Sequence, residues 1–305
     1  MLFSIMFHHF HNDKNHPQSQ GSISAKDLAC LIEFLQSRFN LLNADEYSHK
    51  VLNDGLDQHD VCLSFDDALK SQYDIAAPVL NDAGLKAYFF VYSGAFGAFP
   101  PLHEFSRDFR NSFPSLDAYY QEFFNTAADQ FLAAFNTFLD SYPENYLKDF
   151  PFYTQNDRKY RFLRDRILKD NYASCVLAMM EKHGYCREKN LARLFLSPQD
   201  LKNLHQAGHV IGLHSTNHPT AIHTFSYREQ EKEYQENMDF LQQTLAVKIN
   251  AMSHPCGNYN EDTLTILKKM GIKIGFRSSL SRDYIRSSLE IPREDHTNLL
   301  KTVLQ

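Results

Sequence analysis

Apolar runs alternate with amphipathic stretches along the first hundred residues of the chain. Residues 2–7 are almost entirely apolar, as in a buried strand, and a capping sequence at Ser24–Asp27 opens a helical apolar stripe. Apolar runs at 61–65 and 86–92 predict two more strands, with a helix at 71–82 between them. Strands that alternate with helices at this spacing predict a parallel sheet or barrel.

The same alternation returns after residue 196. Ser197 precedes Pro198, which suits the first position of a helix, and Ser226 with Glu229 has the spacing of a capping box. The elements predicted in this part are helices at 198–207, 226–245 and 260–270 and strands at 209–213, 249–252 and 272–276.

Residues 100–190 interrupt this rhythm and are interpreted as a helical insertion within a single domain that spans 1–305. Aromatic-rich helical patterns occur at 116–139 and at 159–183. In one interpretation the insertion packs against the barrel. In the other it forms a lid or substrate pocket, because the loops that follow barrel strands line the active face.

Two of the predicted strands end in side chains of the kind that bind metal ions. Asp66 and Asp67 follow the strand at 61–65, and adjacent carboxylates are costly to bury unless a charged group lies beside them. His214 and His218 follow a later strand, and a helical turn there would place both imidazoles on one side. One carboxylate with two imidazoles is a ligand set that leaves room for water on a divalent cation.

These residues resemble the motifs of a known family, the polysaccharide deacetylases (the NodB-homology group, carbohydrate esterase family four). Ser64-Phe65-Asp66-Asp67 resembles that family's Thr-Phe-Asp-Asp-Gly, and the stretch from His214 to His218 resembles its His-Ser/Thr-x-x-His. The resemblance covers residues 1–98 and 197–299. It implies an α/β fold, namely a distorted (β/α) barrel of the deacetylase type, here with a helical insertion.

The resemblance also implies roles for the four motif residues. Asp67, His214 and His218 would bind a divalent metal ion, with Zn²⁺ as the expected ion. Asp66 would be the general base that takes a proton from water activated by the metal. Neighbouring side chains on an extended backbone point to opposite sides, which agrees with separate roles for the two aspartates.

The third motif of the family, Arg-x-Pro-Tyr-Gly, departs from its usual form in this chain, where Ser253-His254-Pro255-Cys256-Gly257 occupies its place. The backbone N–H of Cys256 would stabilise the oxyanion. Arg293 is the candidate to replace the missing arginine beside the base; alternatively it forms an ordinary surface ion pair. Ala68 stands where the family has Gly, and because Ala favours right-handed φ, we expect this turn to differ slightly.

A general acid is needed to protonate the leaving amine. The family's Leu-x-His motif has no clear match near the end of this chain. His8 is the preferred candidate, because it ends the first strand, which would lie next to the last strand in a closed barrel. His296 is the alternative, and a third possibility is that neither residue acts.

Composition and charge bear on the partners of the protein and on the compartment in which it acts. The net charge is −6 with acidic and basic residues interspersed, so the sequence does not predict a nucleic-acid partner. Five cysteines form no Cys-x-x-Cys pair, which favours reduced thiols in a cytoplasmic protein. Residues 1–7 lack a basic region before their apolar run, and no apolar run is long enough for an integral membrane segment.

The sequence therefore predicts a metal-dependent carbohydrate N-deacetylase that hydrolyses an N-acyl group, N-acetyl first of all, on an amino sugar or glycan substrate. A small or carrier-linked sugar is favoured over a cell-wall polymer. One alternative is a related amidase or deformylase that acts on a non-polymeric substrate. The other is a non-catalytic scaffold of the same fold that binds a glycan or a protein.

Overall fold

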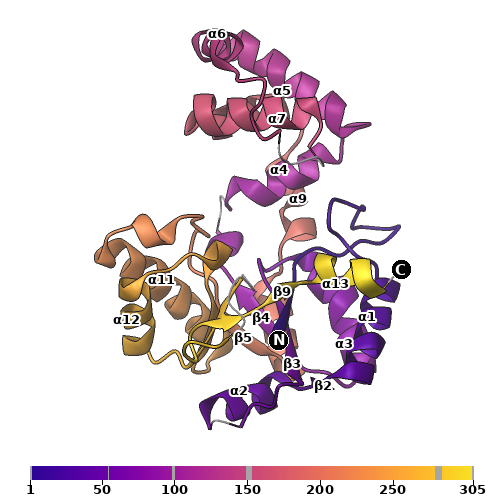
Figure 1. Cartoon of the computed structure of the whole chain (residues 1–305), viewed down its shortest axis with the longest axis vertical. Coiled ribbons are helices and arrows are strands. Elements are labelled where there is room, and N and C mark those ends of the chain that lie inside the picture. The colour runs from indigo at the N-terminus through magenta and orange to yellow at the C-terminus, as the bar shows by residue number, and fades with distance from the viewer. Residues whose placement is uncertain (1, 54, 98–99, 149–152, 279–283, 304–305) are drawn as a thin grey trace. The chain divides into compact units, whose positions relative to one another are not determined.

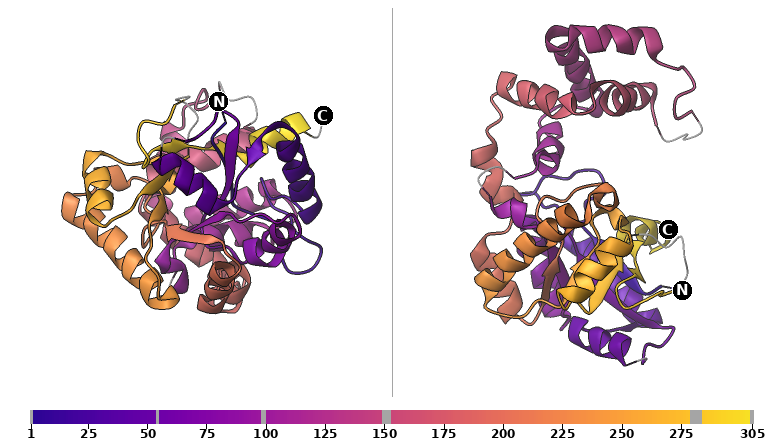
Figure 2. Two further views of the ribbon diagram at one scale, coloured as in Figure 1. Left: turned by 90° about the horizontal axis from the view of Figure 1, so that it is seen from below. Right: turned by 90° about the vertical axis from the view of Figure 1, so that its left-hand side faces the viewer.

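The computed structural model describes residues 2–53, 55–97, 100–148, 153–278 and 284–303. The chain divides into two compact units, one formed by Met1–Pro101 with Ala192–Gln305 and the other by Leu102–Leu191. The larger unit contains the strands, and helices surround them (Figures 1 and 2). None of the helices in the described part of the chain has the length and apolar character needed to span a membrane.

The strands of the larger unit form one parallel sheet that curves into a nearly closed barrel. Their order is β8-β7-β6-β5-β4-β3-β1-β9, with β2 beside β3. This confirms the prediction of a distorted (β/α) barrel. The strands are β1 (Ser4–Phe7), β2 (Asn40–Leu41), β3 (Asp60–Phe65), β4 (Tyr88–Val91), β5 (Val210–Leu213), β6 (Ala251–Ser253), β7 (Ile274–Arg277), β8 (Ile291–Pro292) and β9 (Glu294–Asp295).

A single short segment brings the two ends of the sheet together. β8 pairs with β7 and β9 pairs with β1, yet only Arg293 separates β8 from β9 along the chain. The backbone N–H of Arg293 donates to the carbonyl of Arg277 at 3.1 Å. His8, immediately after β1, therefore lies beside the last strand, as the closed-barrel argument predicted.

The strands are buried on both faces, as expected for a parallel barrel covered by helices. Phe7, Phe65 and Phe89 are in register on neighbouring strands, and their rings stack at 5.1 and 4.8 Å between centroids. Gly212 allows β5 to pack closely, since a Cβ there would lie 2.6 Å from the carbonyl oxygen of Ala251.

Helices cover the barrel with the caps that the sequence predicted at Ser24, Ser197 and Ser226. α1, α3 and α13 lie on one side of the strands, and α11 and α12 on another (Figure 1). The helical segments are α1 (Ala25–Arg38), α2 (Ala44–Leu52), η1 (Gln72–Ala76), α3 (Ala77–Asp82), η2 (Ser93–Phe96), α10 (Pro198–Gln206), η4 (Ile222–Thr224), α11 (Tyr227–Leu245), η5 (Pro255–Gly257), α12 (Glu261–Lys269) and α13 (His296–Val303).

The second unit is helical, but its helices are shorter than the sequence pattern predicted. The helix expected at 116–139 breaks at Phe131, and the one expected at 159–183 breaks at Lys169, whose φ is +48°. The segments are α4 (Leu102–Arg110), α5 (Leu116–Gln130), α6 (Leu132–Ser141), α7 (Gln155–Phe162), η3 (Leu163–Leu168), α8 (Asn171–Lys182) and α9 (Arg187–Leu194).

Packing of aromatic side chains explains both breaks. The rings of Phe124 and Phe138 lie 6.0 Å apart, whereas residues fourteen apart on one straight helix would be separated by about 21 Å. Likewise, the hydroxyls of Tyr160 and Tyr172 are 3.0 Å apart. Folding the chain back at these two points buries aromatic surface that a continuous helix would leave in water.

Candidate active site

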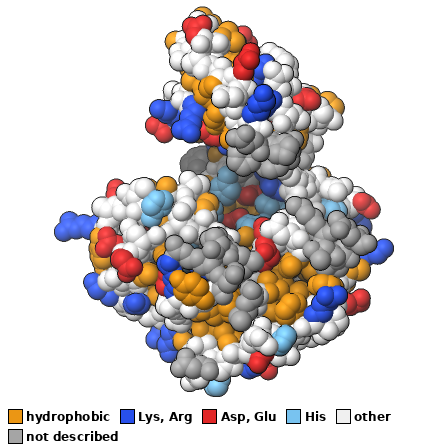
Figure 3. Space-filling view, viewed as in Figure 1, with side chains coloured by type: hydrophobic (Ala, Val, Ile, Leu, Met, Phe, Trp, Pro, Cys, Tyr) orange, Lys and Arg blue, Asp and Glu red, His pale blue; other side chains and the backbone are white. Residues whose placement is uncertain are grey.

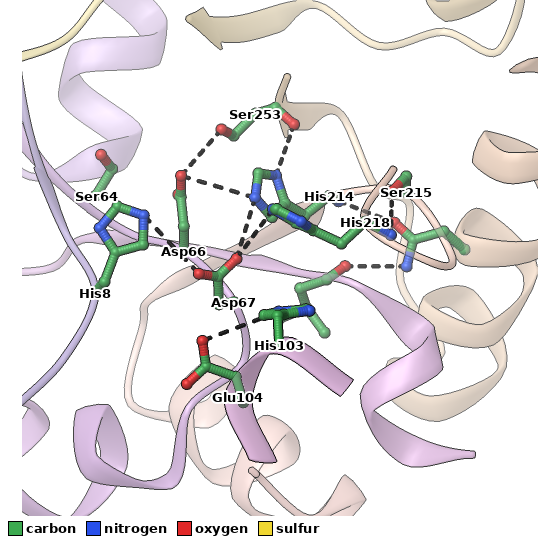
Figure 4. Close-up of polar contacts among 12 residues, drawn as sticks. His8, Ser64, Asp66, Asp67, His103, Glu104, His214, Ser215, His218 and Ser253 are labelled. Atoms are coloured by element: carbon green, nitrogen blue, oxygen red, sulfur yellow. Dashed lines mark hydrogen bonds and ion pairs between the residues drawn. The ribbon is translucent and has the colours of Figure 1, made fainter. Parts of the chain in front are cut away.

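The predicted site residues come together at one rim of the barrel. Because the strands are parallel, the turns after β1, β3, β5 and β6 all lie at the carboxyl ends of the strands. This is the edge at which parallel barrels place their functional loops. The close-up in Figure 4 shows side chains from these turns pointing toward one another.

Asp66 forms a bidentate ion pair with Arg293 in the interior of the barrel. Nη1 of Arg293 donates to Oδ1 of Asp66 at 2.8 Å, and Nη2 donates to Oδ2 at 2.6 Å. The Arg293 side chain is fully buried and also donates to the hydroxyls of Ser64 and Ser253. Arg293 is therefore buried and does not form a surface ion pair. It pairs with Asp66 as the sequence analysis expected of a replacement for the motif arginine.

The small side chain of Ser253 allows the guanidinium of Arg293 to lie beside Asp66. Ser253 occupies the position of the family's motif arginine, and its short side chain leaves room for the guanidinium that arrives from the β8–β9 connection. Its hydroxyl accepts from Nη2 of Arg293 at 2.7 Å and lies 3.3 Å from Oδ2 of Asp66.

Asp67 points away from this ion pair and toward two imidazoles. Its Oδ1 lies 3.4 Å from Nε2 of His214 and 3.3 Å from Nε2 of His218. Nδ1 of His214 lies 2.8 Å from the carbonyl oxygen of Ser253, so it carries the proton and leaves Nε2 free to bind. Asp66 and Asp67 thus have separate surroundings, as predicted, but the reason differs: Asp67 lies beyond β3 with φ of +80°, so a left-handed turn and not extended alternation separates them.

Charge in the site shifts the pKa values of its members in opposite directions. Burial opposes ionisation of Asp66 and Asp67, but Arg293 at the first and His218 at the second outweigh it and lower both pKa values. Burial would also lower the pKa of His214, yet the charges of Asp66 and Asp67 raise it. Both carboxylates are therefore ionised at neutral pH and attract positive charge to the space between them.

The backbone that holds the two histidines differs from the expected helical turn. Residues 214–218 form a bent loop in which Ser215 and His218 have φ of +65° and +52°. The N–H of His218 donates to Oγ of Ser215 at 3.1 Å. Left-handed residues at both points, and not helical spacing, turn the imidazoles toward Asp67.

The turn after β3 also corrects an expectation. Ala68 adopts a left-handed φ of +56°, next to Asp67 at +80°. The alanine therefore does not force a different, right-handed turn. The carbonyl of Ala68 accepts from the N–H of Leu196 at 2.9 Å, and the residue is buried. These surrounding contacts hold a conformation that Ala disfavours by itself.

His8 lies on the opposite side of Asp67 from the histidine pair (Figure 4). Its Nε2 is 3.9 Å from Oδ2 of Asp67, and its side chain is partly exposed. His296, the alternative acid, is buried elsewhere, with its ring nitrogens 3.2 Å from the carbonyl oxygen of Met6 and 3.0 Å from that of Gly21. The structure thus brings His8, but not His296, to the acid pair.

Cys256 lies in the turn after β6 with a left-handed φ of +53°. Burial and the nearby charges of Asp67 and Asp66 raise the pKa of its thiol. The thiol is therefore protonated at neutral pH, which disfavours a thiolate nucleophile. Its backbone N–H is the group that this turn can offer to a reacting oxygen.

Several residues of the site escaped sequence reasoning. Nε2 of Gln72 donates to the carbonyls of Asp66 and His8, at 2.5 and 2.9 Å, and so ties two of the turns together. The ring of Tyr92, just after β4, packs at 5.7 Å from that of His218. Asn237 and Glu233 on α11 bind the histidine loop. Asn237 and Glu233 could have been found from the sequence, because they are polar residues on the side of α11 that faces the barrel.

Comparison with known proteins connects this geometry to a family. The family model described as polysaccharide deacetylase matches residues 154–275, a range that includes both histidines and the turn at Cys256. No curated protein matches the chain.

Solved structures share the fold over nearly the whole chain. The Streptococcus pyogenes deacetylase PplD in complex with acetate has 17% identity and a TM-score of 0.56, covering 99% of this chain and 97% of that one. IcaB from Ammonifex degensii has 14% identity and a TM-score of 0.57, with coverages of 100% and 97%. The deacetylase domain of BpsB from Bordetella bronchiseptica has 13% identity and a TM-score of 0.53, with coverages of 96% and 95%.

Proposed function

Since residues 154–275 match the polysaccharide deacetylase family model and the fold is that of solved deacetylases, we propose that the chain is a metal-dependent hydrolase that removes an N-acetyl group from an amino sugar of a glycan or sugar conjugate. The match to the family model and the shared fold support a carbohydrate deacetylase. The metal dependence and the N-acetyl substrate are our inferences from the residues at the barrel rim.

The observation that carries this proposal is the convergence of Asp67, His214 and His218. Their ligand atoms all lie within 4.8 Å of one another. Oδ1 of Asp67 is buried and has no hydrogen-bond partner among the described residues, which is costly unless a cation or a proton-bearing group faces it. A carboxylate with two imidazoles is a ligand set suited to Zn²⁺, and it leaves a position open.

A cation bound there would polarise the acyl carbonyl and lower the pKa of a water molecule toward neutrality. Asp66 is the residue that accepts the proton of the attacking water. Its charge is maintained by Arg293, and its Oδ2 lies 3.8 Å from Nε2 of His214, on the side of the ligand set. Arg293 also holds the Asp66 carboxylate in one orientation, because both of its oxygens accept from one planar guanidinium.

Two further groups complete the proposed reaction. The N–H of Cys256 donates to the oxyanion that forms when water adds to the acyl carbon. His8 donates a proton to the departing amine from the other side of Asp67, where its partial exposure leaves room for a sugar.

We also propose that the protein acts in the cytoplasm on a small or carrier-linked sugar. All five cysteines are unpaired, as is usual in a reducing compartment. On the face seen in Figure 3, acidic and basic side chains are interspersed and not grouped by sign.

The test combines metal analysis with product detection. We expect about one zinc ion per purified chain and release of acetate from N-acetylated sugars. His218→Ala should lose metal and activity together, whereas the control His223→Ala, an exposed histidine nearby, should keep both. Formate release in place of acetate would indicate the related deformylase. A wild-type protein that binds zinc but releases neither acid would support the non-catalytic scaffold.

A further inference from the structure

We infer that Glu233, on α11, is a positioning residue that holds the histidine loop 214–218 in its metal-binding shape. This inference rests on the proposed metal site and deepens it. The carboxylate of Glu233 does not touch His214 or His218. It acts on Thr216 and Asn217, two of the three residues between them.

The hydrogen bonds of Glu233 join it to the backbone and side chains of Thr216 and Asn217. Its Oε2 accepts from the N–H groups of Thr216 and Asn217, at 3.0 and 2.8 Å. Its Oε1 accepts from Nδ2 of Asn217 at 2.7 Å, and its own carbonyl accepts from Oγ1 of Thr216 at 2.9 Å. Bonds from N–H groups to a carboxylate are stronger than bonds between neutral groups, so this one side chain accounts for much of the loop's support.

The opposite side of the loop is held by different groups. The N–H of Ser93 donates to the carbonyl of Ser215 at 3.3 Å, and that of Gly94 donates to the carbonyl of Thr216 at 2.7 Å. Only glycine fits at position 94, because a Cβ there would lie 2.6 Å from the Thr216 oxygen. The loop is thus bound through its carbonyls on one side and through its N–H groups, by Glu233, on the other.

This support is needed because the loop is strained. Ser215 and His218 both have left-handed φ, and each such residue costs about 1–2 kcal/mol. A loop of that kind keeps its shape only where its surroundings determine it. Without Glu233, the N–H groups of Thr216 and Asn217 would favour other conformations in which His214 and His218 no longer face Asp67 together.

Two more polar side chains on α11 lie in line with Glu233. Asn237, one turn further, is fully buried; its Oδ1 accepts from the N–H of His214 at 2.9 Å, and its Nδ2 donates to the carbonyl of Val91 at 3.0 Å. Gln230, one turn earlier, accepts from Oγ1 of Thr263 at 2.5 Å. Spacings of three and four residues place all three on one face of the helix. Of these three, Glu233 and Asn237 contact the histidine loop, whereas Gln230 binds α12.

The experiment compares Glu233→Ala with Glu236→Ala, an exposed glutamate on the same helix. Two quantities are measured on the full chain: the zinc affinity of the metal-free protein, by competition with a chromophoric chelator, and hydrogen exchange of a peptide that contains 214–218. We expect Glu233→Ala to weaken zinc binding by about 10–100-fold, with faster exchange confined to this loop. Glu236→Ala should match the wild type in both.

Glu233→Gln keeps one accepting oxygen and the size of the side chain. If the alanine variant does not fold, the same two quantities are measured on Glu233→Gln instead. It should change both quantities in the same direction but less. Unchanged zinc affinity and loop exchange in Glu233→Ala, or in Glu233→Gln if only that protein folds, would overturn the inference. A wild-type protein that binds no zinc, in which Glu233→Ala still speeds exchange of 214–218, would support the positioning role and refute the proposed function instead.

Discussion

At the scale of single residues, backbone strain is concentrated where the chemistry is proposed. Among the described non-glycine residues, eight have positive φ, and five of these lie in the turns after β3, β5 and β6: Asp67, Ala68, Ser215, His218 and Cys256. Such conformations persist only when the surrounding contacts determine them. Here the contacts are the hydrogen bonds of Gln72 and Glu233 and the packing of the barrel rim.

The first prediction at this scale separates the two aspartates. Asp67→Asn should lower metal content, because an amide is a poorer ligand than a carboxylate. Asp66→Asn should keep the metal but lose turnover by about 10²–10⁴-fold, since an amide cannot accept the proton from water. Metal content and rate are measured on the same two preparations.

Protein stability must be measured alongside, because Asp66→Asn leaves the buried Arg293 without its counter-charge. Breaking such a pair typically costs about 3–5 kcal/mol, so rates are compared at temperatures where both proteins are folded. Equal loss of metal in the two variants would make Asp66 a second ligand. Full activity in Asp66→Asn would place the base elsewhere.

At the scale of elements, the turn after β3 depends on tertiary contacts more than on its own residues. Ala68 stands where the family has glycine and still adopts φ of +56°. Ala246, at the end of α11, has the same φ but is exposed. Comparing glycine substitutions at these two positions therefore separates the cost of the backbone conformation, which both alanines share, from the contribution of a buried methyl group, which only Ala68 has.

We predict that Ala246→Gly raises the free energy of unfolding by about 1 kcal/mol, because glycine adopts left-handed φ without steric cost. Ala68→Gly should give a smaller gain or none, since it also removes a buried methyl group that contributes about 0.8 kcal/mol. Metal content should not change in either variant. Urea unfolding checks these values, and a large loss of stability in Ala68→Gly would mean that the methyl group, not the backbone, dominates this turn.

At the scale of the whole molecule, the barrel buries neutral histidines that are separate from the metal site. Nδ1 of His209 accepts from the N–H of Ala87 at 3.1 Å, and Nε2 of His254 donates to the carbonyl of Leu289 at 2.9 Å. Burial lowers the pKa of each histidine to about 4. In the unfolded chain both would have pKa values of about 6.5.

These shifts predict that acid destabilises the fold well above the pKa of the carboxylates. Between pH 6.5 and 4 the unfolded chain binds protons at these histidines and the folded chain does not. The contribution of the two neutral histidines to the free energy of unfolding is therefore complete above about pH 6.5 and is lost as pH falls toward 4. Between pH 7.5 and 5, the loss should be about 2 kcal/mol for each histidine.

Urea unfolding of the metal-free wild type and of His254→Phe at these two pH values tests this prediction. The Phe ring can keep the stacking on Tyr259, at 4.2 Å between centroids in the wild type, but it does not titrate. Comparing the two proteins isolates His254 from His214, whose pKa shifts the other way. The variant should lose about 2 kcal/mol less than the wild type on acidification, and an identical loss in both would contradict the prediction.

Much of the fold and of the site could be read from the sequence alone. Apolar runs and capping boxes identified most elements of the barrel, because burial and capping depend on neighbouring residues. The acid pair and the histidine pair were recognisable since each follows a strand, and parallel strands bring their carboxyl ends together. His8 was placed beside the last strand by the same argument of closure.

The rest was decided by the tertiary structure, because it depends on contacts between residues far apart in the chain. The sequence offered Arg293 as a candidate partner of the base but left a surface ion pair open, and only the fold brings it to Asp66 across 227 positions. The left-handed turn at Ala68 runs against its local preference and is held by surrounding packing. The breaks at Phe131 and Lys169 arise where aromatic packing outweighs helix propensity, a competition that only the assembled helices resolve.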